Sequence, residues 1–302
     1  MANPLDPKEL FSHVEDSTSF HLPKAITPPD SHGHVELPQP FLLDEPLVEM
    51  HTGNELIDKT IQPLEFKLTK FMVLEVIIAG IIVVLFVFLA ARLKGGSQAK
   101  GRLWNLLEVF LLYIRDHIAR PCIGYHEADK FVPFLWTMFL FVLGCNLMGM
   151  IPWMGSPTGA LAVTAALALT TFIVVVGSGM KKLGVVGFWK AQVPHMDLPK
   201  PIAIMLIPLI FVIEILGLFI KHCVLAVRLL ANMMAGHVVL AVLLAFIGAS
   251  AVASQAVWGS VTAASVLGAT ALSLLELFVA FLQAYIFTFL SALFIGAAVH
   301  PH

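Results

Sequence analysis

Charged residues are scarce in this chain of 302 residues, where Asp, Glu, Lys and Arg together make up 13% and hydrophobic residues 58%. A soluble globular domain carries roughly 25% charged residues. The shortage excludes an ordinary soluble fold. Long uncharged runs of helical length predict instead an all-α polytopic membrane protein.

Cysteine is also rare, since Cys122, Cys145 and Cys223 are the only three and lie far apart without a CxxC spacing. This excludes a disulfide framework and a zinc site, so we read them as small apolar fillers. The chain has no HExxH, GxSxG or GxxxxGK[ST] motif. We therefore expect no metal, no cofactor and no nucleotide site in this chain.

Residues 1 to 68 form a first region, which holds twelve of the twenty acidic residues and only four lysines. Scattered prolines predict a polar, largely extended tail with a short helix near "DPKELFSHVE". Its opening has no basic segment followed by an apolar core, so no cleavable signal peptide is expected. Five irregularly spaced histidines suggest either a metal site or solvated tail residues, and the irregular spacing favours the second.

Residues 69 to 302 form a second, membrane-embedded domain with about five membrane helices. The apolar runs are residues 71 to 94, 132 to 153, 161 to 180, 201 to 247 and 258 to 298. Between the first two, residues 103 to 121 place Leu106, Val109, Phe110, Leu112 and Tyr113 near helical spacing. This pattern predicts an amphipathic helix on the membrane surface, ending at Pro121.

Basic residues indicate the orientation of these helices. Residues 92 to 130 and 181 to 200 hold eleven of the eighteen lysines and arginines, whereas the opposite turns hold none. The positive-inside rule makes the basic side cytoplasmic, or the matrix side of a mitochondrion. The acidic tail is then outside, the C-terminus is cytoplasmic, and Trp153 and Trp258 are anchors at the outer interface.

The last two apolar runs are too long for simple crossings. A helix over residues 201 to 247 would approach 70 Å, against about 30 Å of hydrocarbon, so it is two crossings or one strongly tilted helix. The segment "FIKHCVL" has no turn residue, and Glu214, Lys221 and Arg228 are spaced by seven, on one stripe of a continuous helix. We therefore predict two long, tilted helices forming an antiparallel hairpin.

Arg228 is the residue that most needs an explanation, because an intramembrane cation is unfavourable without water, a partner or a substrate. In an antiparallel hairpin, the residue numbers of two facing residues add up to nearly the same value along the hairpin. This rule pairs Arg228 with Gln283 and His237 with Glu276. Each polar residue alone could have a structural role, either in a hydrogen bond between helices or as a buried histidine with hydrogen-bond partners. Several in register around one arginine favour function.

The segments "VRLLANMMAGH" and "ELFVAFLQAYIFTFL" resemble the signature of subunit a of the F-type ATP synthase, and the likeness extends more loosely over residues 69 to 302. In that family the arginine, here Arg228, faces the rotating ring of c subunits. The resemblance assigns an outer half-channel to His237, Glu276, Gln283 and Asn232, with Asn146 as a weaker candidate. It assigns Glu214 to a second half-channel, with Lys221 belonging either there or at the interface.

The resemblance implies a stator subunit that carries protons to and from the carboxylates of the c-ring, with ATP chemistry in other subunits. Its implied partners are the c-ring, the b subunits of the peripheral stalk, the F1 sector indirectly, lipid and protons, and no nucleic acid. A bacterial inner membrane is the expected location, and a mitochondrial one the alternative. Some members have the acid and histidine of Glu276 and His237 exchanged, which keeps one of each in the same space.

The main rival is a secondary transporter or channel that uses Arg228 to hold an anion. Such transporters tend to show inverted repeats and helices broken at the midplane by Gly or Pro, and we find no convincing internal repeat. The two readings are distinguished by association with a c-ring.

Overall fold

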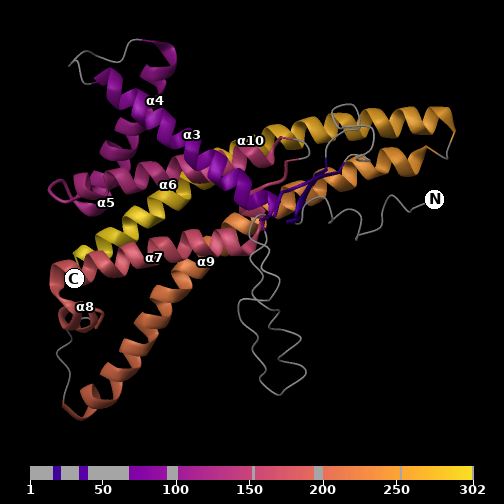
Figure 1. Ribbon diagram of the computed structural model, residues 1–302. Helices are drawn as coiled ribbons and strands as arrows, with labels where there is room; N and C mark the ends of the chain where they lie inside the picture. The colour runs from indigo at the N-terminus through magenta and orange to yellow at the C-terminus, as the bar shows by residue number, and fades with distance from the viewer. Residues whose placement is uncertain are drawn as a thin grey trace.

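The computed structural model describes residues 16–21, 34–39, 68–93, 101–151, 154–193, 200–251 and 254–300. It confirms an all-α polytopic membrane protein, because five of its helices are long and apolar enough to cross a membrane. These are α3 (Lys70–Leu93), α6 (Ala128–Gly149), α7 (Leu161–Leu183), α9 (Lys200–Ser250) and α10 (Gln255–Val299) (Figure 1). Shorter helical elements are α4 (Arg102–Tyr113), η1 (Ile114–Ala119), α5 (Arg120–Ile123), η2 (Pro157–Gly159) and α8 (Val185–Ala191).

Two very long helices dominate the molecule. α9 has 51 residues and α10 has 45, and the chain around Lys221 is helical throughout. The prediction of one continuous helix in each run is confirmed. At 1.5 Å per residue they are about 76 and 68 Å long, so a hydrocarbon layer of about 30 Å accommodates them only when they are steeply inclined.

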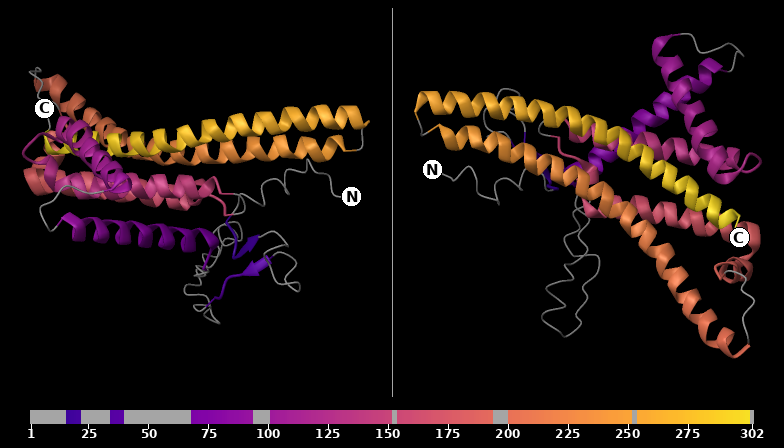
Figure 2. Two further views of the ribbon diagram at one scale, coloured as in Figure 1. Left: turned by 90° about the horizontal axis from the view of Figure 1, so that it is seen from above. Right: turned by 180° about the vertical axis from the view of Figure 1, so that it is seen from behind.

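The hairpin of α9 and α10 is joined to the remaining helices at one end only. Figures 1 and 2 show the C-terminal part of α9 running alongside α10 well beyond the other helices, while its N-terminal part splays away from α7. The main core lies where α6, α7, α9 and α10 meet and extends to η1 and α5. Its fully buried members include Ile118, Leu135, Leu229 and Phe287.

Two ends can be distinguished in the described part of the molecule. α5, α8 and the end of α10 lie together (Figure 1), tied by the Lys182 Nζ–Glu127 Oε1 contact at 3.0 Å. Lys182 lowers the pKa of Glu127 below its usual range, chiefly through this hydrogen bond. The start of α3 lies away from these elements (Figure 1). Lys94 and Lys100 of the first segment rich in Lys and Arg lie outside the described residues, so the predicted orientation stays a prediction. Of the two tryptophans assigned to the outer interface, Trp258 is exposed and Trp153 lies outside the described residues.

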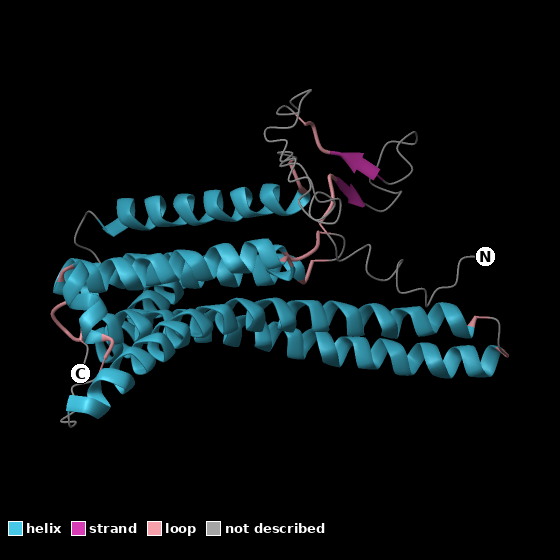
Figure 3. Cartoon of the chain, turned by 90° about the horizontal axis from the view of Figure 1, so that it is seen from below, coloured by secondary structure: helices cyan, strands magenta, loops and turns pink. Residues whose placement is uncertain are grey.

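Part of the N-terminal region pairs with itself and with α3. β1 (Ser19–His21) and β2 (His34–Glu36) form an antiparallel pair beside the start of α3 (Figure 3). The Lys70 N–H donates to the carbonyl of Ser17, and the Phe71 N–H donates to Asp16 Oδ1 at 3.3 Å. These bonds satisfy amide groups that the first turn of a helix leaves without partners. The short helix expected near residue 10 lies outside the described residues.

The surface helix differs in two ways from its prediction. It does not end at Pro121, because α4, η1 and α5 form one helical run that continues to Ile123. η1 is a π-helical turn in which the Arg120 N–H bonds to the carbonyl of Arg115, five residues back. Proline clashes with the carbonyl four residues earlier in a regular α-helix, and a widened turn beside Pro121 relieves that constraint.

The second difference is the face that packs. The side chains buried against the core are Leu111, Ile114 and Ile118. Leu106 and Val109, which the sequence placed on the apolar stripe, are exposed. The helix is therefore apolar on two sides, one covered by protein and one available to lipid, as suits an amphipathic helix in a membrane interface.

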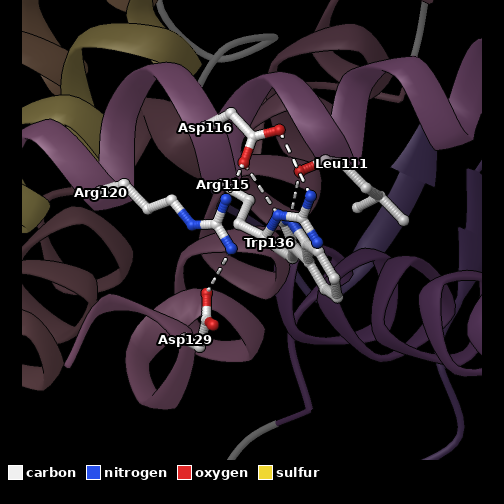
Figure 4. Close-up of polar contacts among 6 residues, drawn as sticks. All are labelled: Leu111, Arg115, Asp116, Arg120, Asp129 and Trp136. Carbon is white, nitrogen blue, oxygen red and sulfur yellow. Dashed lines mark hydrogen bonds and ion pairs between the residues drawn. The ribbon is translucent and has the colours of Figure 1, made fainter. Parts of the chain in front are cut away.

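A chain of ion pairs fastens this helix to the start of α6. Asp116 accepts from Arg115 Nε at 3.0 Å and from Arg120 Nη1 at 2.8 Å, and Arg120 Nη2 reaches Asp129 at 3.5 Å (Figure 4). Trp136 Nε1 donates to the carbonyl of Leu111 at 2.9 Å. The Arg115 guanidinium, and then Arg120, hold the pKa of the Asp116 carboxyl below its ordinary value.

We expect Asp116→Asn to lower the thermal unfolding temperature in detergent at neutral pH. Because the folded-state pKa of Asp116 is depressed, its contribution is present above its ordinary pKa and is lost as the pH falls through the folded value. The difference between variant and native protein should therefore shrink below about pH 4. Asp129→Asn, at the longer and more exposed contact, should have a smaller effect. A pH-independent difference for Asp116→Asn would contradict this account.

A second prediction concerns the close approach of α10 to α5. A Cβ on Gly296 would overlap the backbone carbonyl of Cys122, whereas a Cβ on Gly217 would meet nothing within 4 Å. Gly296→Ala should therefore destabilise the protein by about 1–3 kcal/mol through overpacking. Gly217→Ala should be neutral or stabilise by about 0.5–1 kcal/mol, because alanine favours the helix. Unfolding in denaturant measures both, and equal effects would refute the close packing.

Candidate functional site

His237 and Glu276 form the centre of the polar site between α9 and α10. His237 Nδ1 and Glu276 Oε1 are 2.9 Å apart, and the two side chains are 13% and 10% exposed. The expectation that these two residues face each other is confirmed. Gly236 makes the contact possible, because a Cβ there would lie 2.8 Å from Glu276 Oε1.

This pair shares one proton in either of two forms. With Glu276 ionised, the Nδ1–H donates to the carboxylate; with Glu276 protonated, its hydroxyl donates to Nδ1. The other ring nitrogen, Nε2, is buried and has no hydrogen-bond partner among the described residues. A buried polar atom of this kind normally bonds to another polar group or to water, so Nε2 is the atom of the pair through which a further hydrogen bond can form.

Gln283 lies seven residues after Glu276 on α10. Its hydrogen-bond partner is not the residue that the sequence analysis predicted. Asn232 Nδ2 donates to Gln283 Oε1 at 3.0 Å. The counting of residue numbers along the hairpin predicted that Gln283 faces Arg228. Arg228 lies one helical turn before Asn232. Gln283 is buried and Asn232 is exposed, so this bond connects the interior of the hairpin to its surface.

Arg228 is half-buried, and no described residue forms a hydrogen bond or ion pair with it. It precedes His237 by nine residues, about half a turn around the helix axis. The two side chains therefore occupy opposite sides of α9. The guanidinium keeps its charge under physiological conditions, and within the described chain that charge is available to another molecule.

Glu214 and Lys221 extend the stripe of Arg228 toward the N-terminal end of α9. Glu214 is half-buried and Lys221 exposed, and no described residue forms a hydrogen bond or ion pair with either side chain. The structure therefore keeps them on one line with Arg228 but does not bring the three together by direct contact.

Asn146 is joined to the same site by a buried network that the sequence did not reveal. Thr158 Oγ1 donates to Asn146 Oδ1 at 2.8 Å, and Ser156 Oγ lies 2.8 Å from Thr158 Oγ1. Asn146 Nδ2 donates to the carbonyl of Ala280 at 3.3 Å. Ala280 lies between Glu276 and Gln283 on α10, so the network supports the helix face that carries both.

Three further polar residues were missed. Ser156 and Thr158 belong to a short segment that has the sequence of an ordinary turn, and its packing against α6, α7 and α9 buries them. His222 is 4% exposed, although it sits beside Lys221 in the sequence. The signal for His222 was available: a titratable side chain in an apolar helix, on a different face from Arg228.

Comparison with known proteins identifies the family of this chain. Residues 72–296 match the family described as ATP synthase A chain. The chain belongs to this family. The match includes every candidate site residue from Asn146 to Gln283 and leaves out the N-terminal region.

Individual members of the family agree. ATP synthase subunit a of Myxococcus xanthus is 42% identical over 245 residues, covering 79% of this chain and 76% of that protein. The subunit a of Anaeromyxobacter sp. strain Fw109-5 is 37% identical and covers 97% of this chain and 70% of its own length. That of Anaeromyxobacter dehalogenans strain 2CP-1 is 44% identical, over 70% of this chain and 53% of its own.

The geometry of the pair predicts how it responds to exchange. In His237→Glu two acids face each other, and in Glu276→His two histidines do. The double exchange restores one acid and one histidine. We expect the double variant to retain more ATP-driven proton pumping in membrane vesicles than either single variant, a coupling that a double-mutant cycle measures. Gly268→Ala, which makes only ordinary contacts with Leu243, is a control for changes within the hairpin. Strictly additive losses would show that the two side chains do not act as a unit.

Proposed function

We propose that this chain is the stator subunit a of an F-type ATP synthase, with two offset aqueous half-channels that connect the two sides of the membrane to the c-ring. The observation that carries the proposal is the charge of Arg228, half-buried on an apolar helix and unpaired within the described chain. Such a charge is unfavourable unless a partner supplies the opposite one. The carboxylate of each c subunit is that partner.

Arg228 has two roles in this proposal. A c-ring carboxylate is neutral while it faces lipid, because the ionised form is strongly disfavoured there. Beside Arg228 the ionised form is favoured, so the carboxylate releases its proton. The guanidinium does not itself carry protons, and its fixed charge repels a proton that would pass directly from one half-channel to the other.

The outer half-channel is assigned to the polar residues on the opposite side of α9. His237 and Glu276 accept and pass protons, and the Asn232–Gln283 bond leads toward the rotor surface. Asn146 stabilises the position of α10 through its hydrogen bond to the carbonyl of Ala280. Glu214, on the N-terminal part of α9, is assigned to the second half-channel, and Lys221 either lines it or extends to the interface.

The partners follow from the same assignment. They are the c-ring, the b subunits of the peripheral stalk, the F1 sector indirectly, and lipid. We place the chain in a bacterial inner membrane, with its acidic N-terminal region, residues 1 to 68, on the outer side and its C-terminus in the cytoplasm. The concentration of eleven of the eighteen lysines and arginines in residues 92 to 130 and 181 to 200 supports this orientation.

The test is Arg228→Ala in the assembled complex. ATP-driven acidification of inverted membrane vesicles should stop, because the passing carboxylate loses the charge that favours its ionised form. Passive proton leak without ATP should rise, since the barrier is also lost. Arg228→Lys should be severely impaired too, because a desolvated ammonium can shed its proton and lacks the planar fork of a guanidinium.

Stability gives an independent control for this experiment. The subunit should fold as well as the native chain or better, since an unfavourable buried charge is removed. Leu216→Ala, at an exposed apolar position of the same helix, is the matched variant and should pump normally. Normal pumping by an assembled Arg228→Ala complex would refute the proposal.

A further inference from the structure

His222 is a buried titratable side chain that the proposed half-channels do not yet use. It lies on α9 and is 4% exposed. Phe172 of α7 meets its ring edge-on at 5.2 Å, and Phe294 of α10 lies 5.1 Å away. The imidazole is therefore held between three helices, in surroundings whose ring contacts are aromatic and apolar.

The hydrogen bonding of this ring leaves one nitrogen free. Nδ1 lies 2.8 Å from the carbonyl of Leu218, and a carbonyl only accepts, so Nδ1 carries a proton. In the neutral ring Nε2 is then an unprotonated base. Nε2 is buried and has no hydrogen-bond partner among the described residues. The site thus presents a proton acceptor that nothing within the described chain satisfies.

The position of His222 places it on the Glu214 side of Arg228. It precedes Arg228 by six residues, about 9 Å along the axis and a third of a turn around it. His237, the other histidine of α9 with an unsatisfied Nε2, is about 22 Å away along the same helix. Between the two histidines, the inward face of α9 carries Leu225, Leu229 and Met233, which are 1%, 0% and 2% exposed.

Those three side chains separate the two histidines within the protein. These apolar side chains of α9 offer a proton no polar group to bind, so this face of α9 does not by itself connect the two histidines. In the proposal that follows, a proton held at His222 reaches the other side by way of the rotor face, where Arg228 lies.

We propose that His222 is a proton-binding residue of the half-channel on the Glu214 side, exchanging a proton at Nε2 with water that leads to the c-ring carboxylate. The inference rests on the proposed function and adds a residue to it. The ring contacts from the packed elements come from Phe172 of α7 and Phe294 of α10, neither of which titrates. On α9 itself, the charged neighbour that acts on the ring is Lys221.

The test compares two substitutions in the assembled complex. His222→Phe keeps an aromatic ring between Phe172 and Phe294, and His222→Asn keeps a donor for the carbonyl of Leu218; neither can exchange the proton. ATP-driven pumping into inverted vesicles is measured as the pH of the medium, which bathes the cytoplasmic side, is raised from about 6 to 8, across the range in which imidazole ionises. The ratio of variant to native rate cancels the pH dependence of ATP hydrolysis.

We expect both ratios to fall with rising pH, to roughly tenfold below native pumping at the upper end, because protons become scarce and the collecting base is missing. Phe172→Leu loosens the same packing without removing a base, so its ratio should not change with pH. If His222→Phe fails to assemble, His222→Asn decides.

Two outcomes would overturn the inference, and they are distinguishable. Native rates for His222→Phe, or a deficit equal at every pH, would make His222 a packing residue while leaving the proposed function intact, provided that Arg228→Ala is inactive in the same vesicles. Normal pumping by Arg228→Ala would remove the proposed function and this inference together.

Discussion

The constraint on which this structure depends is the positive charge of Arg228, which no residue in the described part of the chain neutralises. The fold could have paired Arg228 internally, since Glu276 is an acid on the neighbouring helix. It instead pairs Glu276 with His237 on the opposite side of α9 and leaves the guanidinium without a described partner. A cation in a membrane helix is unfavourable without water, a partner or a substrate, and the proposed function supplies that partner as a carboxylate of the c-ring.

The two sides of α9 therefore have different tasks. One side carries Glu214, Lys221 and Arg228 in a line, with solvent or lipid exposure. The other side is packed against α7 and α10 and carries two histidines with the buried apolar residues Leu225, Leu229 and Met233 between them. In the proposed function, titratable groups on both sides of α9 let this single helix contact two separate aqueous half-channels.

The arrangement works only if α9 and α10 keep their register. Three contacts hold it: the His237–Glu276 and Asn232–Gln283 bonds between the two helices, and the bond from Asn146 to the carbonyl of Ala280. Further along, the approach of Gly296 to Cys122 fixes the end of α10 against α5. α5 continues from the π-helical turn, and the ion pairs of Asp116 and Arg120 fasten that turn to the start of α6. The surface helix is thus linked through α10 to the polar site between α9 and α10.

The sequence by itself determined the features that depend on length and spacing. The length of the apolar runs specified five membrane helices and two continuous long ones, because a bilayer sets the scale for both. The facing of His237 and Glu276 followed from counting along an antiparallel hairpin. Such counting resolves facing residues to about one helical turn, which is why Gln283 was placed opposite Arg228 and is bonded to Asn232 instead. Only the tertiary structure decided which side chains are buried: the burial of His222, the network through Ser156 and Thr158, and the packed face of the surface helix depend on how separate helices meet, and hydrophobic periodicity contains no information on contacts between distant segments.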